Sequence, residues 1–250
     1  MGESHGAFVM GHDRDVLPFV TSINVACGFH GGDPTVMRQT VTLAAMHGVA
    51  VGAHPGLPDL LGFGRREMAV SAQEVYDMVT YQVGALEAIA SAAAGIPLQH
   101  VKPHGALYNM AAVRDDLADA IARAIRDVDH TLILMGLSGS ALIGAARSQG
   151  LTTASEVFAD RGYMADGTLV SRSRNDALIT NVDLAVTRAV RMVSQHEVIA
   201  VDGSAVTLDA ESICIHGDAP HAALFAQRIR GGLEAAGITV QPLNARSLAS

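Results

Sequence analysis

The chain of 250 residues is long enough to bury about three quarters of its unfolded surface in one core, and its 49% hydrophobic and 17% charged residues are typical of a globular protein. A net charge of −8 and only 4% aromatic residues argue against nucleic acid as a partner. No stretch approaches the roughly 20 apolar residues of a membrane span, and the N-terminal residues lack the pattern of a secretory signal, so we expect a cytoplasmic protein. Its two cysteines, Cys27 and Cys214, are expected to be reduced.

Apolar, β-branched runs alternate with amphipathic stretches along the chain. The predicted strands are residues 21–27, 48–53, 98–103, 131–136, 151–158, 212–216 and 237–243. The predicted helices are residues 71–94, 114–128, 182–195 and 220–236, and a hairpin is expected within 198–208. This alternation predicts a parallel sheet in a single α/β domain that covers residues 1–250.

At this length and repeat number, a closed or nearly closed (βα) barrel of irregular, TIM-like form is favoured over an open doubly wound sheet. No G-x-G-x-x-G fingerprint follows a strand, and a phosphate-binding P-loop would need a second lysine, which the chain lacks. In a barrel, functional groups gather at the carboxyl ends of the strands. Residues at those ends are therefore the first candidates for a site.

Four histidines stand at the ends of predicted strands, each followed by Gly or Pro. They are His30, His54, His104 and His216. Each alone is more often structural, but a barrel brings such ends into one pocket. Together with nearby aspartates they could form a proton-transfer couple or a metal site. Because no H-E-x-x-H or C-x-x-C spacing is present, a divalent metal stays an open possibility and its ligands stay unknown.

Lys102 is the only lysine, and all 16 other basic residues are arginine. Strand alternation places Lys102 and His104 on one face. A parallel strand is normally buried on both faces, so an unpaired lysine there is costly, which favours a functional pocket. The alternative is that Lys102 pairs for purely structural reasons with an inward carboxylate, for which Glu156 and Asp160 are the candidates.

Four other charged residues allow two interpretations each. Asp33 precedes Pro34 and a helical run, so it is typical of a helix N-cap but is also a candidate functional carboxylate. Asp218 has the same two interpretations. Arg65 and Arg161 are candidates to bind a substrate carboxylate through two parallel hydrogen bonds, or else are ordinary surface arginines.

Six segments carry a resemblance to a known family. They are "NVACGFHGGDP", "VGAHPGLPD", "GFGRR", "HVKPHGALYN", "EVFADRGY" and "CIHGD", in this order over nearly the whole chain. Together they resemble the LamB/YcsF family, the A subunits of 5-oxoprolinase. The resemblance implies an irregular (βα) barrel similar to the glycoside hydrolase and polysaccharide deacetylase class. It also implies ATP-dependent opening of 5-oxo-L-proline to L-glutamate in a complex with two other subunits, B and C.

The resemblance suggests roles for the candidate residues. Lys102 would stabilise developing negative charge, His104 and His30 would move protons, and one aspartate would activate water. The candidates for that aspartate are Asp33, Asp160 and Asp218. The candidates for substrate binding are Arg65, Arg161, His54, Tyr108, His216 and Asp218. Because the chain has no phosphate loop, we expect a partner subunit to perform or share the handling of ATP.

In one respect the sequence departs from the family pattern. Family members usually begin with a strand of the form D-L-N-x-D that leads into G-E-S, whereas Met1 stands directly before Gly2, Glu3 and Ser4 here. We therefore expect the first strand to be missing, and a gap between the 21–27 strand and the C-terminal strand.

Two other functions fit the same residues. One is a metal-dependent hydrolase or deacetylase that acts on amides or carbohydrates. The other is a non-catalytic subunit that binds a lactam for its partners.

Overall fold

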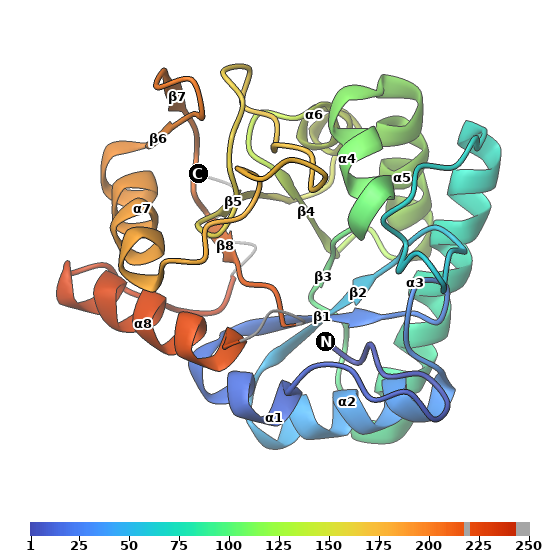
Figure 1. Ribbon diagram of the computed structural model, residues 1–250. Coiled ribbons are helices and arrows are strands. Elements are labelled where there is room, and N and C mark those ends of the chain that lie inside the picture. Colours follow the sequence, from blue (N-terminus) through green and yellow to red (C-terminus); the bar gives the residue numbers. More distant parts are fainter. Residues whose placement is uncertain (218–220, 244–250) are drawn as a thin grey trace.

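The computed structural model describes residues 1–217 and 221–243, and its centre is a curled, all-parallel sheet with the strand order β1-β2-β3-β4-β5-β8 (Figure 1). The strands are β1 (Ser22–Ala26), β2 (Ala50–His54), β3 (His100–Val101), β4 (Ile133–Leu137), β5 (Thr153–Phe158) and β8 (Ser212–Cys214). A separate antiparallel ribbon consists of β6 (Glu197–Ile199) and β7 (Ala205–Thr207). The sheet forms part of a barrel wall, which confirms the predicted (βα) barrel class.

Helices cover the outer side of this sheet (Figure 1). They are α1 (Asp13–Val16), the 3-10 turn η1 (Leu17–Phe19), α2 (Pro34–Met46), α3 (Ala72–Ala94), α4 (Gly105–Val113), α5 (Asp115–Val128), α6 (Ala141–Ser148), α7 (Val182–Gln195) and α8 (Ala222–Ala235). The longest, α3, begins with a reciprocal capping box between Ser71 and Glu74 and ends at Gly95 in the left-handed conformation. Within the described residues, no helix has both the length and the apolar character needed to cross a bilayer.

Strand alternation separates an apolar outer face of the sheet from an inner face that carries both polar and apolar side chains. On the outer side, Val25 and Val101 belong to the large core that the helices cover. On the inner side, the Nε2–H group of His100 donates to Asn24 Oδ1 at 2.9 Å. Gly52 on β2 makes room for this imidazole, because a Cβ at that position would lie 2.2 Å from His100 Nε2. The interior of the curl therefore holds polar side chains that bond one another, next to the apolar side chains of Ile133 and Met135.

Most predicted elements are confirmed, and one strand is wrong. Residues 238–243 form no strand, because Ile238 and Val240 pack instead with the apolar side chains of α7 and α8. The strand predicted at 98–103 is reduced to the two residues of β3. The helices α4 and α6 were not predicted.

The expected gap in the sheet is present. Among the described strands, β1 and β8 are the two edges and do not pair with each other. The backbone of Met1 lies along the edge of β1, where its amine donates to the Asn24 carbonyl at 2.8 Å and its carbonyl accepts from the Ala26 N–H at 3.0 Å. The last strand of the sheet is thus β8 and not the predicted 237–243 segment.

Asp33 is the N-cap of α2. Its Oδ1 accepts hydrogen bonds from the backbone N–H groups of Thr35 and Val36, both at 2.9 Å, and its Oδ2 accepts one from Gly6 at 3.1 Å. These bonds lower the pKa of the Asp33 carboxyl, with that from Val36 the largest cause.

We predict that Asp33→Ala lowers the free energy of unfolding by about 1 kcal/mol, because the first N–H groups of α2 lose their acceptor. Asp33→Ser should lose clearly less, since the hydroxyl oxygen can accept the same bonds. Urea unfolding of both variants measures the difference, and equal losses would contradict the capping role.

Candidate active site

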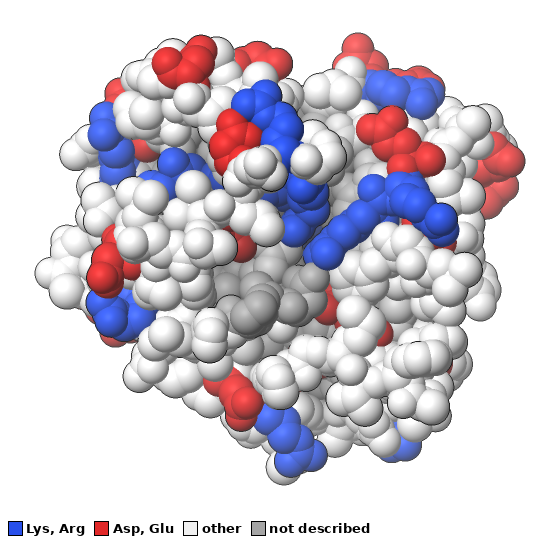
Figure 2. Space-filling view, in the orientation of Figure 1, with Lys and Arg blue, Asp and Glu red and all other residues white. Residues whose placement is uncertain are grey.

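A cavity of about 690 Å³ opens at the carboxyl ends of the sheet strands. Its walls include the ends of β2, β4, β5 and β8 and the segment that follows β3. Although the chain is acidic overall, basic side chains lie on two sides of the hollow in this face (Figure 2). The basic residues that line the cavity are Arg65, Lys102, Arg161 and Arg172. The acidic residues of the lining are Glu3, Glu67 and Asp166, so the cavity is polar and offers several cationic groups that can contact an anionic group of a small ligand.

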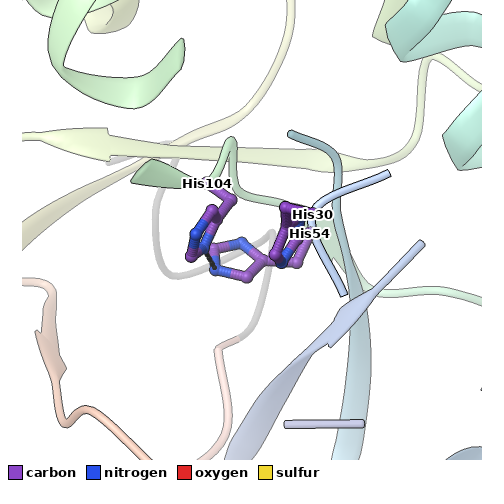
Figure 3. Close-up of side chains that lie close together, drawn as sticks. All are labelled: His30, His54 and His104. Carbon is purple, nitrogen blue, oxygen red and sulfur yellow. Dashed lines mark hydrogen bonds between the residues drawn. The ribbon is translucent and has the colours of Figure 1, made fainter. Parts of the chain in front are cut away.

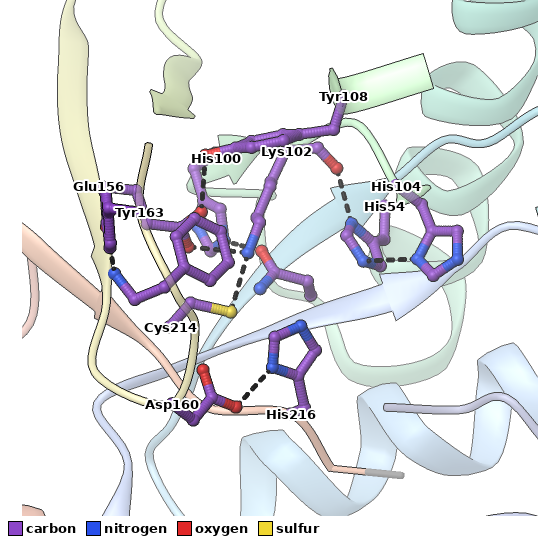
Figure 4. A network of polar contacts seen from close by, with 12 residues as sticks. His54, His100, Lys102, His104, Tyr108, Glu156, Asp160, Tyr163, Cys214 and His216 are labelled. Carbon is purple, nitrogen blue, oxygen red and sulfur yellow. Dashed lines mark hydrogen bonds and ion pairs between the residues drawn. The ribbon is translucent and has the colours of Figure 1, made fainter. Parts of the chain in front are cut away.

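Lys102 lies in this cavity wall within a buried polar network (Figure 4). Its Nζ lies 2.7 Å from Glu156 Oε1 and 3.0 Å from the Cys214 sulfur. The second oxygen of Glu156 accepts a hydrogen bond from the Tyr108 hydroxyl at 3.0 Å. The ammonium also lies 5.0 Å from the centre of the Phe158 ring. Both interpretations of Lys102 from the sequence therefore hold. Lys102 pairs with the inward carboxylate of Glu156, and it also lines the cavity.

This network fixes the protonation of its members. Burial alone lowers the pKa of Lys102, but the Cys214 sulfur and the Glu156 carboxylate outweigh it and raise that pKa above its ordinary value. Burial raises the pKa of the Cys214 thiol to about 12. Lys102 therefore stays an ammonium at neutral pH and acts as a fixed charge, not as a base. A compact ammonium fits between a carboxylate and a thiol, whereas the planar guanidinium of arginine would not.

A second pair joins His216 and Asp160 at the same end of the cavity (Figure 4). His216 Nδ1 lies 2.7 Å from Asp160 Oδ2. Burial alone raises the pKa of Asp160, but attraction to His216 outweighs it and the pKa is lowered, so the carboxylate stays charged. His216 Nδ1 donates to this carboxylate, so in the neutral form of the ring Nε2 is the acceptor, on a ring that lines the cavity. This arrangement is that of an oriented general base.

Three more histidines form a buried cluster (Figure 3). The Nδ1–H group of His54 donates to the Lys102 carbonyl at 2.6 Å, and the Nε2–H group of His104 donates to the Phe63 carbonyl at 2.8 Å. The ring of His30 stacks on that of His104 with 3.7 Å between centroids. The structure thus brings together the strand-end histidines that the sequence singled out, in two groups: this cluster and the His216 pair.

The two predicted arginines both reach the cavity, in different ways. Arg161 is buried, and its guanidinium donates to the carbonyls of Ala177 at 3.1 Å and Val170 at 2.6 Å, so it holds the irregular segment after β5 in place. The guanidinium of Arg65 lies 4.8 Å from the centre of the Phe63 ring.

Of the two remaining predicted aspartates, the structure describes one. Asp33 is the cap of α2 and is not among the residues that line the cavity. Asp218 lies outside the described residues.

The cavity contains residues for which the sequence suggested no site role. Cys214 ends β8 and stands two positions before His216, so continued strand alternation could have placed both on one face. Arg172 stands in the irregular segment between β5 and α7, where no periodic pattern predicts which way a side chain points. The free state of Cys27 and Cys214 is confirmed.

The fold and site define a (βα) barrel-type protein with a polar ligand cavity at the carboxyl ends of its strands. Within that class, the chain belongs to the LamB/YcsF family, whose sequence model matches residues 1–248.

Individual relatives extend this result. The chain is 58% identical over 243 residues to the 5-oxoprolinase A subunit of Tolumonas auensis, with 97% of this chain and 96% of the relative covered. It is also 58% identical over 244 residues to the 5-oxoprolinase A subunit of Bacillus subtilis, with 98% and 95% covered. The crystal structure of the lactam utilization protein from Thermus thermophilus superposes with a TM-score of 0.91 at 49% identity and covers 97% of both chains. The similarity spans the whole fold and not one motif.

His100 makes the stability of the fold depend on pH. Burial, helped by the nearby Lys102 charge, lowers the pKa of His100 from 6.5 to about 3. Between these values the unfolded chain binds a proton that the folded chain does not, so stability falls as the pH falls.

We predict that His100→Gln makes the free energy of unfolding less dependent on pH between about 6.5 and 3, by up to about 1.4 kcal/mol per pH unit. Glutamine keeps a donor for Asn24 but takes up no proton. Urea unfolding at several pH values measures the slope, and an unchanged slope would show that His100 is protonated in the folded state.

Proposed function

We propose that this chain is the A subunit of an ATP-dependent 5-oxoprolinase, which opens the ring of 5-oxo-L-proline to give L-glutamate. The observation that carries the proposal is the placement of two groups beside one aromatic ring. The Lys102 ammonium lies 5.0 Å from the centre of the Phe158 ring, and the His216 ring lies 5.9 Å from it. A fixed positive charge and an oriented base thus face the same part of the cavity. The names of the relatives support this choice of substrate.

The cavity offers a site for each end of this substrate. 5-Oxoproline carries one carboxylate and one lactam, and the arginines of the lining match the carboxylate through paired N–H donors. We assign this contact to Arg65 and Arg172, while Arg161 contributes charge and holds the wall. The lactam carbonyl is then directed toward Lys102.

The proposed reaction adds water to the lactam carbonyl carbon. His216 Nε2 accepts a proton as the water oxygen bonds to that carbon, and the Lys102 ammonium stabilises the negative oxygen. The carbon–nitrogen bond then breaks, and the nitrogen takes up a proton and leaves as the amine of glutamate. Burial is the main cause that lowers the pKa of His104, to about 3, and also that of His30, so both are weak proton acceptors at neutral pH. For this reason we place proton transfer at His216.

An unstrained lactam is a poor electrophile, which explains a coupling to ATP. The residues of this chain do not fit a phosphate-binding role of the P-loop type, because the only lysine is committed to Glu156. We therefore assign ATP handling to the partner subunits B and C.

The test of the proposal is 5-oxoproline-dependent ATP hydrolysis by this chain together with both partner subunits. Formation of glutamate in step with ADP is the expected result. Binding of 5-oxoproline without turnover in the complete complex would contradict the proposal and favour a lactam-binding subunit.

Replacement of Lys102 should abolish turnover. Lys102→Met alone leaves Glu156 buried and unpaired, a change that typically costs about 3–5 kcal/mol, so we combine it with Glu156→Gln. We predict that this double variant folds but loses about 100-fold or more in kcat, because the fixed charge is gone. Thermal unfolding checks the fold, and near-normal turnover would refute the role of Lys102.

His216→Asn should lower kcat by about 10²- to 10⁴-fold, because the general base is removed. Asp160→Asn should have a smaller effect, since an amide oxygen still accepts from Nδ1. A matched control is His196→Asn, because His196 and Asp209 form a similar but exposed pair 3.9 Å apart, far more open to water. Steady-state kinetics of the complex measure kcat for all three variants. Equal losses of kcat for the His216 and His196 variants would contradict the assignment of His216 as the general base.

A further inference from the structure

The hydrogen bonds of His54 and His104 determine which of their nitrogens carry protons. A backbone carbonyl only accepts, so His54 must donate from Nδ1 to the Lys102 carbonyl, and His104 must donate from Nε2 to the Phe63 carbonyl. In the neutral rings, His54 Nε2 and His104 Nδ1 therefore each carry a lone pair and no proton. These two atoms face each other at 3.1 Å (Figure 3). Such a contact is repulsive unless a cation lies between the two nitrogens.

A proton is a poor candidate for that cation. Both rings are buried, and a proton shared between their nitrogens would create an imidazolium charge in the protein interior, which is costly. Both imidazoles are thus held in the neutral form that binds metal ions.

His30 supplies an independent observation. It is fully buried, and neither of its ring nitrogens has a hydrogen-bond partner among the described residues. A buried polar atom left unpaired destabilises the fold. Two glycines leave room for this ring. A Cβ at Gly56 would lie 2.6 Å from His30 Nδ1, and a Cβ at Gly64 would lie 2.7 Å from the Cβ of His30. The surroundings are thus shaped to hold an imidazole that has no partner of its own.

We propose that His30, His54 and His104 bind one divalent transition-metal ion of the zinc type. Their nitrogens lie within 4.8 Å of one another, and three neutral imidazoles are a donor set that suits such ions. With metal–nitrogen distances of about 2.1 Å, the 3.1 Å separation of His54 and His104 corresponds to a ligand–metal–ligand angle of about 95°.

One adjustment is required for the third ligand. The rings of His30 and His104 lie 3° from parallel, and parallel stacked rings cannot both point a lone pair at the same ion. The ring of His30 must therefore turn about its Cβ–Cγ bond when the ion binds. His54 and His104 also line the cavity, so the proposed ion would lie beside it. The inference depends on the histidine geometry alone and not on the proposed reaction.

The experiment is metal binding by the purified chain after removal of metals with a chelator. Zinc uptake is measured by equilibrium dialysis, and cobalt is added as a spectroscopic probe whose visible bands report nitrogen ligands. We expect one ion per chain. His54→Gln, His104→Gln and His30→Gln should each weaken binding by about 100-fold or more. His100→Gln, which changes a buried histidine outside the cluster, should bind as the unchanged protein does.

Each other outcome overturns the proposal in whole or in part. Absence of stoichiometric zinc or cobalt binding refutes the site, as does equal binding by His104→Gln. Unchanged binding by His30→Gln removes His30 from the ligand set. Because binding is measured without substrate or partner subunits, these outcomes are independent of whether the complex opens 5-oxoproline.

Discussion

The buried ion pair between Lys102 and Glu156 is the constraint on which the site depends. Each charge alone would be costly inside the curl of the sheet, so each requires the other, and the 2.7 Å contact joins β5 to the segment after β3. Tyr108 holds the second carboxylate oxygen, which ties α4 to the same pair. The ammonium that results has a fixed position and a fixed charge. A site that stabilises a negative oxygen needs both properties before substrate arrives.

The same segment after β3 also organises the histidine cluster. The backbone carbonyl of Lys102 sets the tautomer of His54, while its side chain points to Glu156. His104 follows two residues later and meets His54 at 3.1 Å. One stretch of backbone therefore carries the ammonium of Lys102 and the lone pair of His104, and its Lys102 carbonyl orients the ring of His54 on β2. Electrophilic groups of two kinds, a fixed charge and a proposed metal ion, would lie on the same wall.

Prediction from the sequence succeeded where the hydrophobic pattern is periodic. The helix expected at 182–195 is α7 with the same bounds, because its apolar residues recur with helical spacing. It failed where the pattern is absent or ambiguous. The helix α4 is apolar on nearly all sides, so no amphipathic signal marks it. The segment at 237–243 has the alternation of a strand, but Ile238 and Val240 pack with the apolar side chains of α7 and α8 and Leu243 packs on Ile133 and Met135, so the segment forms side-chain contacts and no strand.

The sequence by itself determined the barrel class, the strand-end histidines and the importance of the single lysine, because residue type and spacing are local properties. The tertiary structure is needed to identify which side chains contact one another. The folded chain pairs Lys102 with Glu156 and His216 with Asp160. It also makes Asp33 a helix cap that does not line the cavity. It also set the tautomers of His54 and His104, since these depend on which carbonyls lie within hydrogen-bonding distance. Contacts between residues about 40 to 60 positions apart follow from how strands curl and pack, and no local pattern contains that information.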